Sequence, residues 1–192
     1  QYIQKGMIFM CGIAGWVNFG ESIKDKTKIM EEMSKALSPR GPDEKGFFYS
    51  DNCDMAHVRL TIIDPENGKQ PMVKENYTIC YNGELYNTGE LQKELEALGY
   101  SFGGHSDTEV LLISYLQWGE KCLDRLNGIY AFAVWDSTRK RLFAARDRAG
   151  VKPFYYSFTS RGFLFASEPK ALLKHPEVKP IIDEEGIAQI ML

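Results

Sequence analysis

Short apolar runs typical of β-strands gather toward the two ends of the sequence, and helix-like segments lie between them. The first group of runs falls between residues 12 and 83 and the second between residues 129 and 167, with helical spacing of apolar residues at 87–98 and 106–118. Strands and helices therefore do not alternate as they do in parallel βαβ folds. This order predicts an α+β protein whose strands pair antiparallel.

The expected elements are bounded by turn and capping residues. Strands are predicted at 12–19, 46–50, 55–63, 77–83, 129–136, 141–147, 153–158 and 162–167, and helices at 26–37, 87–98, 106–118 and 168–175. Asn87 with Glu90, and Ser106 with Glu109, have the spacing of a helix capping box. We therefore expect these side chains to begin the second and third helices.

The composition is that of an ordinary globular domain. Hydrophobic residues make up 44% of the 192 residues, and 23 basic against 26 acidic residues give a net charge of −3. Without a basic excess, neither nucleic acid nor an anionic membrane surface is an expected partner. No apolar stretch reaches the roughly 18 residues that a membrane-spanning helix needs.

The cysteines are spread along the chain without any C-x2-C pair, at Cys11, Cys53, Cys80 and Cys122. This spacing excludes zinc, iron–sulfur and thioredoxin-type sites, so no metal is expected. The apolar run at 7–17 resembles part of a signal peptide, but Met10 stands where a lipoprotein cysteine requires a small residue. We therefore expect a cytoplasmic protein with reduced thiols, in which the last three cysteines have packing roles.

Common catalytic motifs, such as the phosphate-binding loop and H-E-x-x-H, are absent, and the three histidines have no neighbours that suggest a site. What remains is a set of polar residues at strand and helix ends: Arg59, Asn82-Gly83-Glu84, Ser106-Asp107 and Arg146-Asp147-Arg148. A guanidinium can clamp a carboxylate, an acidic side chain suits an ammonium, and an amide beside a glycine N–H can bind an oxyanion. The set fits an α-amino acid whose side-chain carbonyl is attacked. Each residue alone is weak evidence, since Asp107 is otherwise an acid in the first turn of a helix and Asn82-Gly83 is otherwise a turn; spacing alone leaves both interpretations open.

Eight segments in order resemble one known family. They are MCGIAGW (10–16), RGPDEKG (40–46), HVRLTIID (57–64), YNGELYN (81–87), SDTEVLL (106–112), LNGIYAFAVWD (126–136), RDRAGVKPFYY (146–156) and FASEPKALL (165–173). Together they are similar to the glutamine amidotransferase domain of glutamine-hydrolysing asparagine synthetases, over about residues 10–185. The RGPD segment favours that branch over the glucosamine-phosphate synthases.

The resemblance implies an N-terminal-nucleophile hydrolase fold, which is a four-layer αββα sandwich of two antiparallel sheets flanked by helices. It also implies hydrolysis of L-glutamine with Cys11 as the nucleophile. The other roles that it implies are a carboxylate clamp at Arg59, an oxyanion hole at Asn82 and Gly83, α-amino contacts at Glu84 and Asp107, and strand backbone beside the substrate at Leu60 and Ile63. The sequence departs from the family at Pro39, where a polar residue or histidine often precedes RGPD.

The residue before Cys11 matters for this chemistry. A cysteine thiol has a pKa of about 8.5 and needs a base at neutral pH, and the α-amino group of the same residue, with a pKa of about 7.7–8.0, is suited to that role. With Met10 attached, the Cys11 nitrogen is an amide without a basic lone pair, so the chain as written is expected to be inactive. A translation start at Met10, self-cleavage after an earlier start, and a cloning remnant at residues 1–6 are the competing explanations.

The expected organisation is an N-terminal extension at 1–10, a glutaminase domain at 11–185 and the stub of a synthetase domain at 186–192. The Ser-Gly-Gly-x-Asp-Ser pyrophosphate loop of such a synthetase domain is absent, and Gly103-Gly104 is interpreted as a turn. No cofactor is expected for this domain, because ATP and Mg²⁺ would belong to the synthetase domain.

The expected partners are L-glutamine and that C-terminal domain, with a homodimer as a possible assembly. Two alternatives stay open at this point. The domain could feed ammonia to a different ATP-activated acceptor, or it could be a non-catalytic binding module of the same fold.

Overall fold

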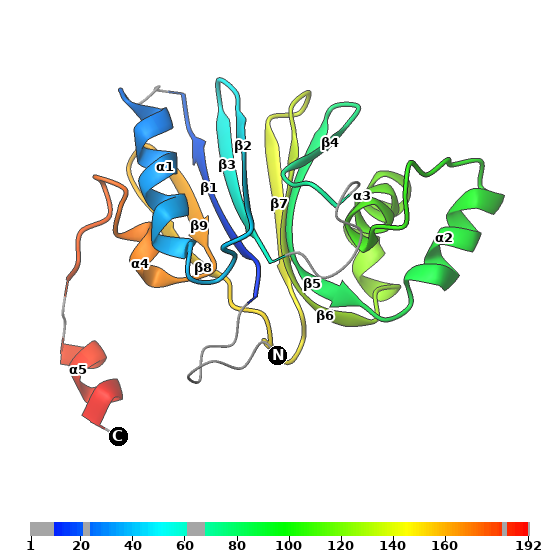
Figure 1. Cartoon of the computed structure of the whole chain (residues 1–192). Helices are drawn as coiled ribbons and strands as arrows, with labels where there is room; N and C mark the ends of the chain where they lie inside the picture. The colour runs from blue at the N-terminus through cyan, green and yellow to red at the C-terminus, as the bar shows by residue number, and fades with distance from the viewer. Residues whose placement is uncertain (1–9, 21–23, 61–67, 182–183, 192) are drawn as a thin grey trace.

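The computed structural model describes residues 10–20, 24–60, 68–181 and 184–191. Two antiparallel sheets lie face to face, and helices cover the outer face of each sheet (Figure 1). The molecule is therefore built of four layers, and the α+β class and the αββα sandwich expected from the sequence are confirmed.

The two sheets are formed by strands from both ends of the chain. The first sheet has the order β2 (Glu44–Tyr49), β3 (Cys53–Arg59), β1 (Gly12–Asn18), β9 (Gly162–Ala166) and β8 (Tyr155–Phe158). The second has the order β4 (Met72–Lys74), β5 (Tyr77–Leu85), β6 (Gly128–Asp136) and β7 (Arg141–Arg146). Strand β1 is central in its sheet and buried along its whole length, which explains why its residues 12–17 are apolar or glycine instead of alternating with polar residues.

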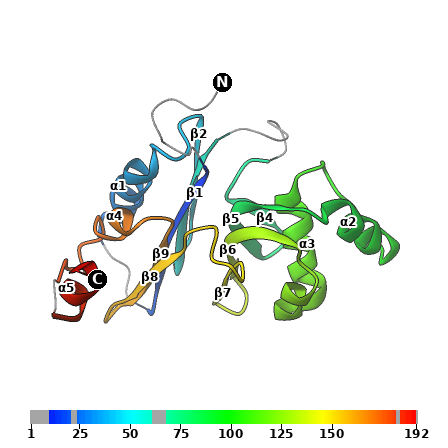
Figure 2. The same cartoon turned by 90° about the horizontal axis from the view of Figure 1, so that it is seen from below.

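The helices divide between the two outer faces. Helices α1 (Lys26–Leu37) and α4 (Pro169–Leu172) lie on the first sheet, whereas α3 (Asp107–Trp118) lies on the second and carries α2 (Thr88–Ala97) on its outer side (Figure 2). A 3-10 helix at Gly119–Asp124 follows α3, and α5 (Glu184–Met191) is the last element described. No helix in the described part of the chain has the length and apolar character needed to span a membrane.

Apolar side chains fill the space between each pair of layers. Between the sheets, Ile13, Met55, Trp135 and Phe165 belong to one buried cluster that also contains Cys53 and Cys80. Cys122 is buried in the cluster between the second sheet and α3. All four cysteines are free thiols, and the packing environments expected for the last three are confirmed.

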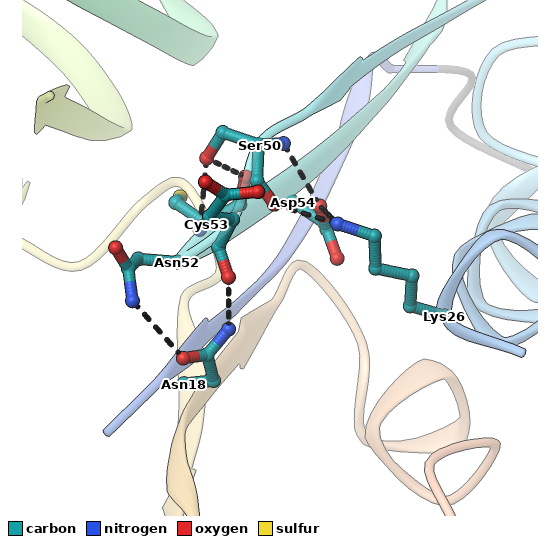
Figure 3. Close-up of polar contacts among 7 residues, drawn as sticks. Asn18, Lys26, Ser50, Asn52, Cys53 and Asp54 are labelled. Carbon is teal, nitrogen blue, oxygen red and sulfur yellow. Dashed lines mark hydrogen bonds and ion pairs between the residues drawn. The ribbon is translucent and has the colours of Figure 1, made fainter. Parts of the chain in front are cut away.

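Polar side chains close one end of the first sheet, where β2 turns into β3. We call this region, formed by Asn18, Lys26 and Ser50–Asp54, the hairpin end (Figure 3). Asn18 donates from Nδ2 to the Asp51 carbonyl at 2.6 Å and accepts from Asn52 Nδ2 at 3.2 Å.

Lys26 on α1 donates to the Ser50 carbonyl at 2.7 Å and lies 3.5 Å from the Asp54 carboxylate (Figure 3). These contacts join the hairpin to the end of β1 and to the first turn of α1. The hairpin end is therefore a region in which the polar side chains pair with one another.

Several details differ from the sequence prediction. Strand β4 and the 3-10 helix were not predicted, because neither has a long enough periodic pattern. The capping box at Asn87 is wrong, since its side chain instead accepts from the Asn127 amide at 3.0 Å and donates to the Arg125 carbonyl at 2.9 Å. Ser106 does cap α3, accepting from the Thr108 amide at 3.3 Å.

The second capping box is only half formed. The Glu109 carboxylate accepts from the amides of Gly103 and Gly104 and pairs with Lys74 at 2.9 Å, so it does not reach back to Ser106. The paired glycines form the bend that was expected of them, and Glu109 fixes that bend to the start of α3.

Candidate active site

A pocket of about 190 Å³ opens at the end of the sandwich opposite the hairpin end. Its lining comes from both sheets, at the ends of β3 and β5, and from the start of α3. Among its lining residues are Cys11, Arg59, Leu60, Asn82, Gly83, Glu84 and Asp107. Every residue to which the resemblance assigned a role at the site is thus brought together except Ile63, which lies outside the described residues.

Cys11 immediately precedes β1, and the pairing of β1 with β3 sets its position. Because Gly12 pairs with Val58, the Cys11 thiol lies beside the end of β3. Its Sγ accepts from the Leu60 amide at 3.4 Å and lies 3.6 Å from the Leu60 carbonyl oxygen. Arg40 Nε donates to the Cys11 carbonyl at 3.0 Å and so fixes the backbone.

The thiol lies in an environment that favours its protonated form. Burial raises the pKa of Cys11, and the Leu60 hydrogen bond with the positive charges of Arg59, Lys152 and Arg40 only partly offsets that effect. A thiol of this kind needs a nearby base before it can attack a carbonyl.

Asn82 is on the pocket lining, and its amide nitrogen is buried and unpaired. Its side chain is only 2% exposed, and Nδ2 has no hydrogen-bond partner among the described residues. Buried polar atoms are rarely left unpaired, so an orphaned amide donor on a pocket wall points to a ligand acceptor. Next to it, Gly83 must be glycine, since a Cβ there would lie 2.5 Å from the Ile129 carbonyl oxygen.

The Arg59 guanidinium lies on the side of the pocket formed by the first sheet. Its side chain is almost fully buried, and NH1 lies 3.2 Å from the Glu44 carboxylate, which comes from the paired position on β2. This contact orients the guanidinium along the end of β3, where it lines the pocket.

Acidic side chains lie on the side formed by the second sheet and α3. The Asp107 carboxylate accepts from the Tyr81 hydroxyl at 2.8 Å and from the Leu85 amide at 3.4 Å. Burial raises the pKa of Asp107, while these hydrogen bonds act in the opposite direction. With Glu84 also on the lining, the pocket has a negative wall facing the positive Arg59 side.

Some lining residues were missed by the sequence analysis. His57 is fully enclosed, its Nε2 has no partner among the residues described, and burial lowers its pKa to about 3. Gln70 accepts from the Tyr81 amide at 2.6 Å and donates to Thr108 Oγ1 at 3.2 Å, which ties the segment before β4 to the pocket wall. Of these two residues, only His57 had a signal in the sequence, because it lies two residues before Arg59 on the same strand.

Lys152 and Met10 complete the mouth of the pocket. The Lys152 Nζ atom lies 3.3 Å from the Met10 Sδ atom, and both residues are on the lining. Asp147, which the sequence placed among the candidate polar residues, does not line the pocket. It instead accepts backbone hydrogen bonds and holds the loop that carries Lys152.

The pocket therefore combines a thiol, a buried amide donor, a cationic side and an anionic side. Within the described ranges, no group of histidine, cysteine and acidic side chains could hold a metal ion. The charge arrangement suits the carboxylate and ammonium of an α-amino acid, with the thiol and the Asn82 amide left for its side-chain carbonyl.

Comparisons with known proteins agree with this chemistry. "Asparagine synthetase [glutamine-hydrolyzing] 3" of Bacillus subtilis is 51% identical over 185 residues, which are 94% of this chain and 30% of that protein. "Asparagine synthetase [glutamine-hydrolyzing] 1" of the same organism is 40% identical over 187 residues, which are 95% of this chain and 29% of that protein. The chain thus spans about 30% of the length of these relatives.

Solved structures support the fold. The glutamine phosphoribosylpyrophosphate amidotransferase of B. subtilis superimposes with a TM-score of 0.70 at 24% identity, over 92% of this chain and 48% of that one. The sequence profile of the glutamine amidotransferase domain matches residues 10–192, which is nearly the whole sequence. The chain therefore belongs to the glutamine amidotransferase domain family.

Proposed function

We propose that this domain hydrolyses L-glutamine to L-glutamate and ammonia through a thioester on Cys11. The observation that carries the proposal is the unpaired, buried amide of Asn82, a residue that lines the same pocket as Cys11. A donor held there without a protein partner is available to an oxygen that becomes negatively charged during attack on the amide carbonyl.

The charged walls support the proposed orientation of glutamine. The α-carboxylate binds Arg59, whose guanidinium is fixed by Glu44, and the α-ammonium binds Glu84 and Asp107. The Leu60 backbone lies beside the substrate; the expected contact at Ile63 is part of the same proposal.

Proton transfers through the Cys11 α-amino group complete the proposed reaction. The free α-amino group of Cys11 takes the thiol proton, and the thiolate attacks the side-chain carbonyl to give an oxyanion that accepts hydrogen bonds from Asn82 and the Gly83 amide. Collapse breaks the C–N bond, and the amine returns the proton so that ammonia leaves. Water, deprotonated by the same amine, then attacks the thioester and releases glutamate and the thiol.

The position of Met10 supports the requirement for a free amine. In this chain the Cys11 nitrogen is an amide, the Met10 amide donates to the Arg40 carbonyl at 3.0 Å, and the Met10 side chain is on the pocket lining. With Met10 attached, the basic α-amino group of Cys11 is absent, and Met10 occupies part of the pocket lining. We infer that the active form begins at Cys11, that residues 1–10 are an extension and that residues 11–185 are the glutaminase domain.

The names of the relatives support a proposal for the molecule that accepts the ammonia. We propose that in the full-length protein the ammonia serves asparagine synthesis from aspartate, carried out by a C-terminal synthetase domain that begins within the expected 186–192 segment. ATP and Mg²⁺ belong to that domain, and the glutaminase half needs no cofactor. Free thiols on all four cysteines suit the cytoplasmic location that we also propose.

Replacing the nucleophile tests the proposed activity directly. In a protein that begins at Cys11, Cys11→Ala should abolish conversion of glutamine to glutamate, because no thioester can form. Glutamine binding, measured by calorimetry, should persist because Arg59, Glu84 and Asp107 are unchanged. Residual turnover at the wild-type rate would show that Cys11 is not the nucleophile.

A further inference from the structure

Lys152 is carried by the loop that joins β7 to β8 and crosses from the second sheet to the first. The Asp147 carboxylate accepts from the amides of Val151 at 2.9 Å, Lys152 at 3.0 Å and Tyr130 at 3.2 Å. These hydrogen bonds hold the pKa of Asp147 below its usual range, so it stays charged. The loop is thus fixed to β6, and Lys152 is held in place at the pocket mouth.

The loop has a second clamp. Arg146 donates from Nε to the Lys152 carbonyl at 2.6 Å and from its other guanidinium nitrogen to the Gly150 carbonyl. Gly150 has a φ of 64°, a conformation that favours glycine. A loop fixed by both Arg146 and Asp147 presents the Lys152 side chain in a defined direction, toward Met10 and Cys11.

The cations around Cys11 differ in their partners. Arg40 pairs with Glu168 at 3.1 Å, and Arg59 pairs with Glu44 at 3.2 Å. Lys152 makes no ion pair with any carboxylate that the structure describes, and its Nζ contacts the Met10 thioether instead. The positive charge of a half-buried ammonium that has no carboxylate partner is not neutralised, so it can shift the pKa of neighbouring groups.

Charges on every neighbouring element act on this ammonium. Burial and the Arg40 charge lower the pKa of Lys152, whereas negative charge on Cys11, Glu84 and Asp147 favours its charged form. The relation is mutual, since Lys152 is among the positive charges that favour the Cys11 thiolate. Lys152 and Cys11 are therefore electrostatically coupled across the pocket mouth.

We propose that Lys152 is a positioning residue of the glutaminase reaction, whose ammonium faces the Cys11 thiol and α-amine once Met10 is absent and favours the deprotonated form of both. The proposal rests on the proposed function. A nearby positive charge stabilises a thiolate and disfavours an ammonium, so one side chain favours both the nucleophile and the base. The Met10 thioether occupies the space in which Lys152 would approach that amine.

The pH dependence of kcat/KM tests this role in proteins that begin at Cys11. Lys152→Met should move the acidic limb of the profile to higher pH, so that kcat/KM falls about three- to tenfold near pH ~6.5 and much less near pH ~9. KM should change little, and Lys152→Arg should restore the wild-type profile. Lys26→Met is the matched control, because Lys26 is a half-buried lysine at the hairpin end, and its profile should follow the wild type.

Alkylation of Cys11 by iodoacetamide as a function of pH provides a readout that needs no turnover. The other three cysteines are fully buried, so the fast reaction reports Cys11. Lys152→Met should require higher pH for the same alkylation rate. Failure of the wild type to hydrolyse glutamine would count against the proposed function alone, and this titration would still decide the role of Lys152.

Two results would overturn the role assigned to Lys152. One is a Lys152→Met protein whose alkylation and kcat/KM profiles both coincide with those of the wild type. The other is a rise in KM without a shift of the acidic limb, which would show that Lys152 binds the substrate carboxylate.

Discussion

The two ends of the sandwich differ in how their polar side chains are paired. At the hairpin end, Asn18 and its neighbours pair with one another, and even the buried Asp54 has Lys26 and the Ser50 amide as partners. At the pocket end, Asn82 Nδ2 and His57 Nε2 have no partner in the part of the chain that is described. An unsatisfied buried polar group costs about 1–3 kcal/mol, so the pocket end is held open at the expense of stability.

The comparison explains how one pair of strands serves two purposes. The hairpin end fixes the strands to each other and to α1, and the register that it sets carries through to Cys11 and Arg59 at the other end. At the pocket end this register positions Cys11 and Arg59, while Asn82 Nδ2 and His57 Nε2 keep no partner among the described residues. In the proposed mechanism, the substrate oxygen supplies the missing partner of the Asn82 amide.

Among the variants that compare the two ends, the largest effect is expected at Asn82. Asn82→Ala removes the side-chain donor proposed for the oxyanion and should lower kcat about 100- to 1000-fold, with a small effect on KM. Because Nδ2 has no protein partner described, the free energy of unfolding should change less than for a paired asparagine. A steady-state assay with urea denaturation of the same sample measures both, and unchanged kcat would remove Asn82 from the oxyanion hole.

Asn18 is the matched residue at the hairpin end. Asn18→Ala deletes the hydrogen bond to the Asp51 carbonyl and those from Asn52 Nδ2 and the Gly20 amide, and should lower the free energy of unfolding by about 2 kcal/mol. Turnover of glutamine should stay at the wild-type level at temperatures where the variant is folded. A variant with wild-type stability and reduced kcat would contradict the assignment of stability to the hairpin end and of the proposed chemistry to the pocket end.

Acid should also weaken the protein through its buried histidines. Burial lowers the pKa of His175 from 6.5 to about 4, and that of His57 to about 3. The unfolded chain binds these protons below pH about 6.5 and the folded protein does not, so the free energy of unfolding falls as the pH drops from about 6.5 to 4.

The variant His175→Gln isolates one of these contributions. The side chain packs against Trp16 with ring centroids 4.3 Å apart, outside the pocket, so the variant leaves the proposed chemistry untouched. Urea denaturation at pH ~7 and ~4.5 should show a smaller loss of stability in the variant than in the wild type. Equal losses in the two proteins would mean that His175 does not titrate differently on unfolding.

Much of the candidate site could be predicted because its residues lie in sequence segments that resemble one family and occur in the same order. Arg59, Asn82 and Asp107 stand at strand or helix ends, and antiparallel pairing brings such ends to one edge. Lys152 could not be placed in this way, since it is 142 residues from Met10 and reaches it through a loop fixed by Asp147. The failed Asn87 cap has a similar cause, because a tertiary contact to Asn127 replaces the local hydrogen bond.

The free amino group of Cys11 is the central requirement of the proposed mechanism. The most direct measurement is glutamine turnover by the protein that begins at Cys11 beside the protein that retains residues 1–10, with the intact mass of each sample determined. Turnover confined to the protein whose mass begins at Cys11 is the predicted result. Equal turnover by a sample whose mass still includes residues 1–10 would contradict it.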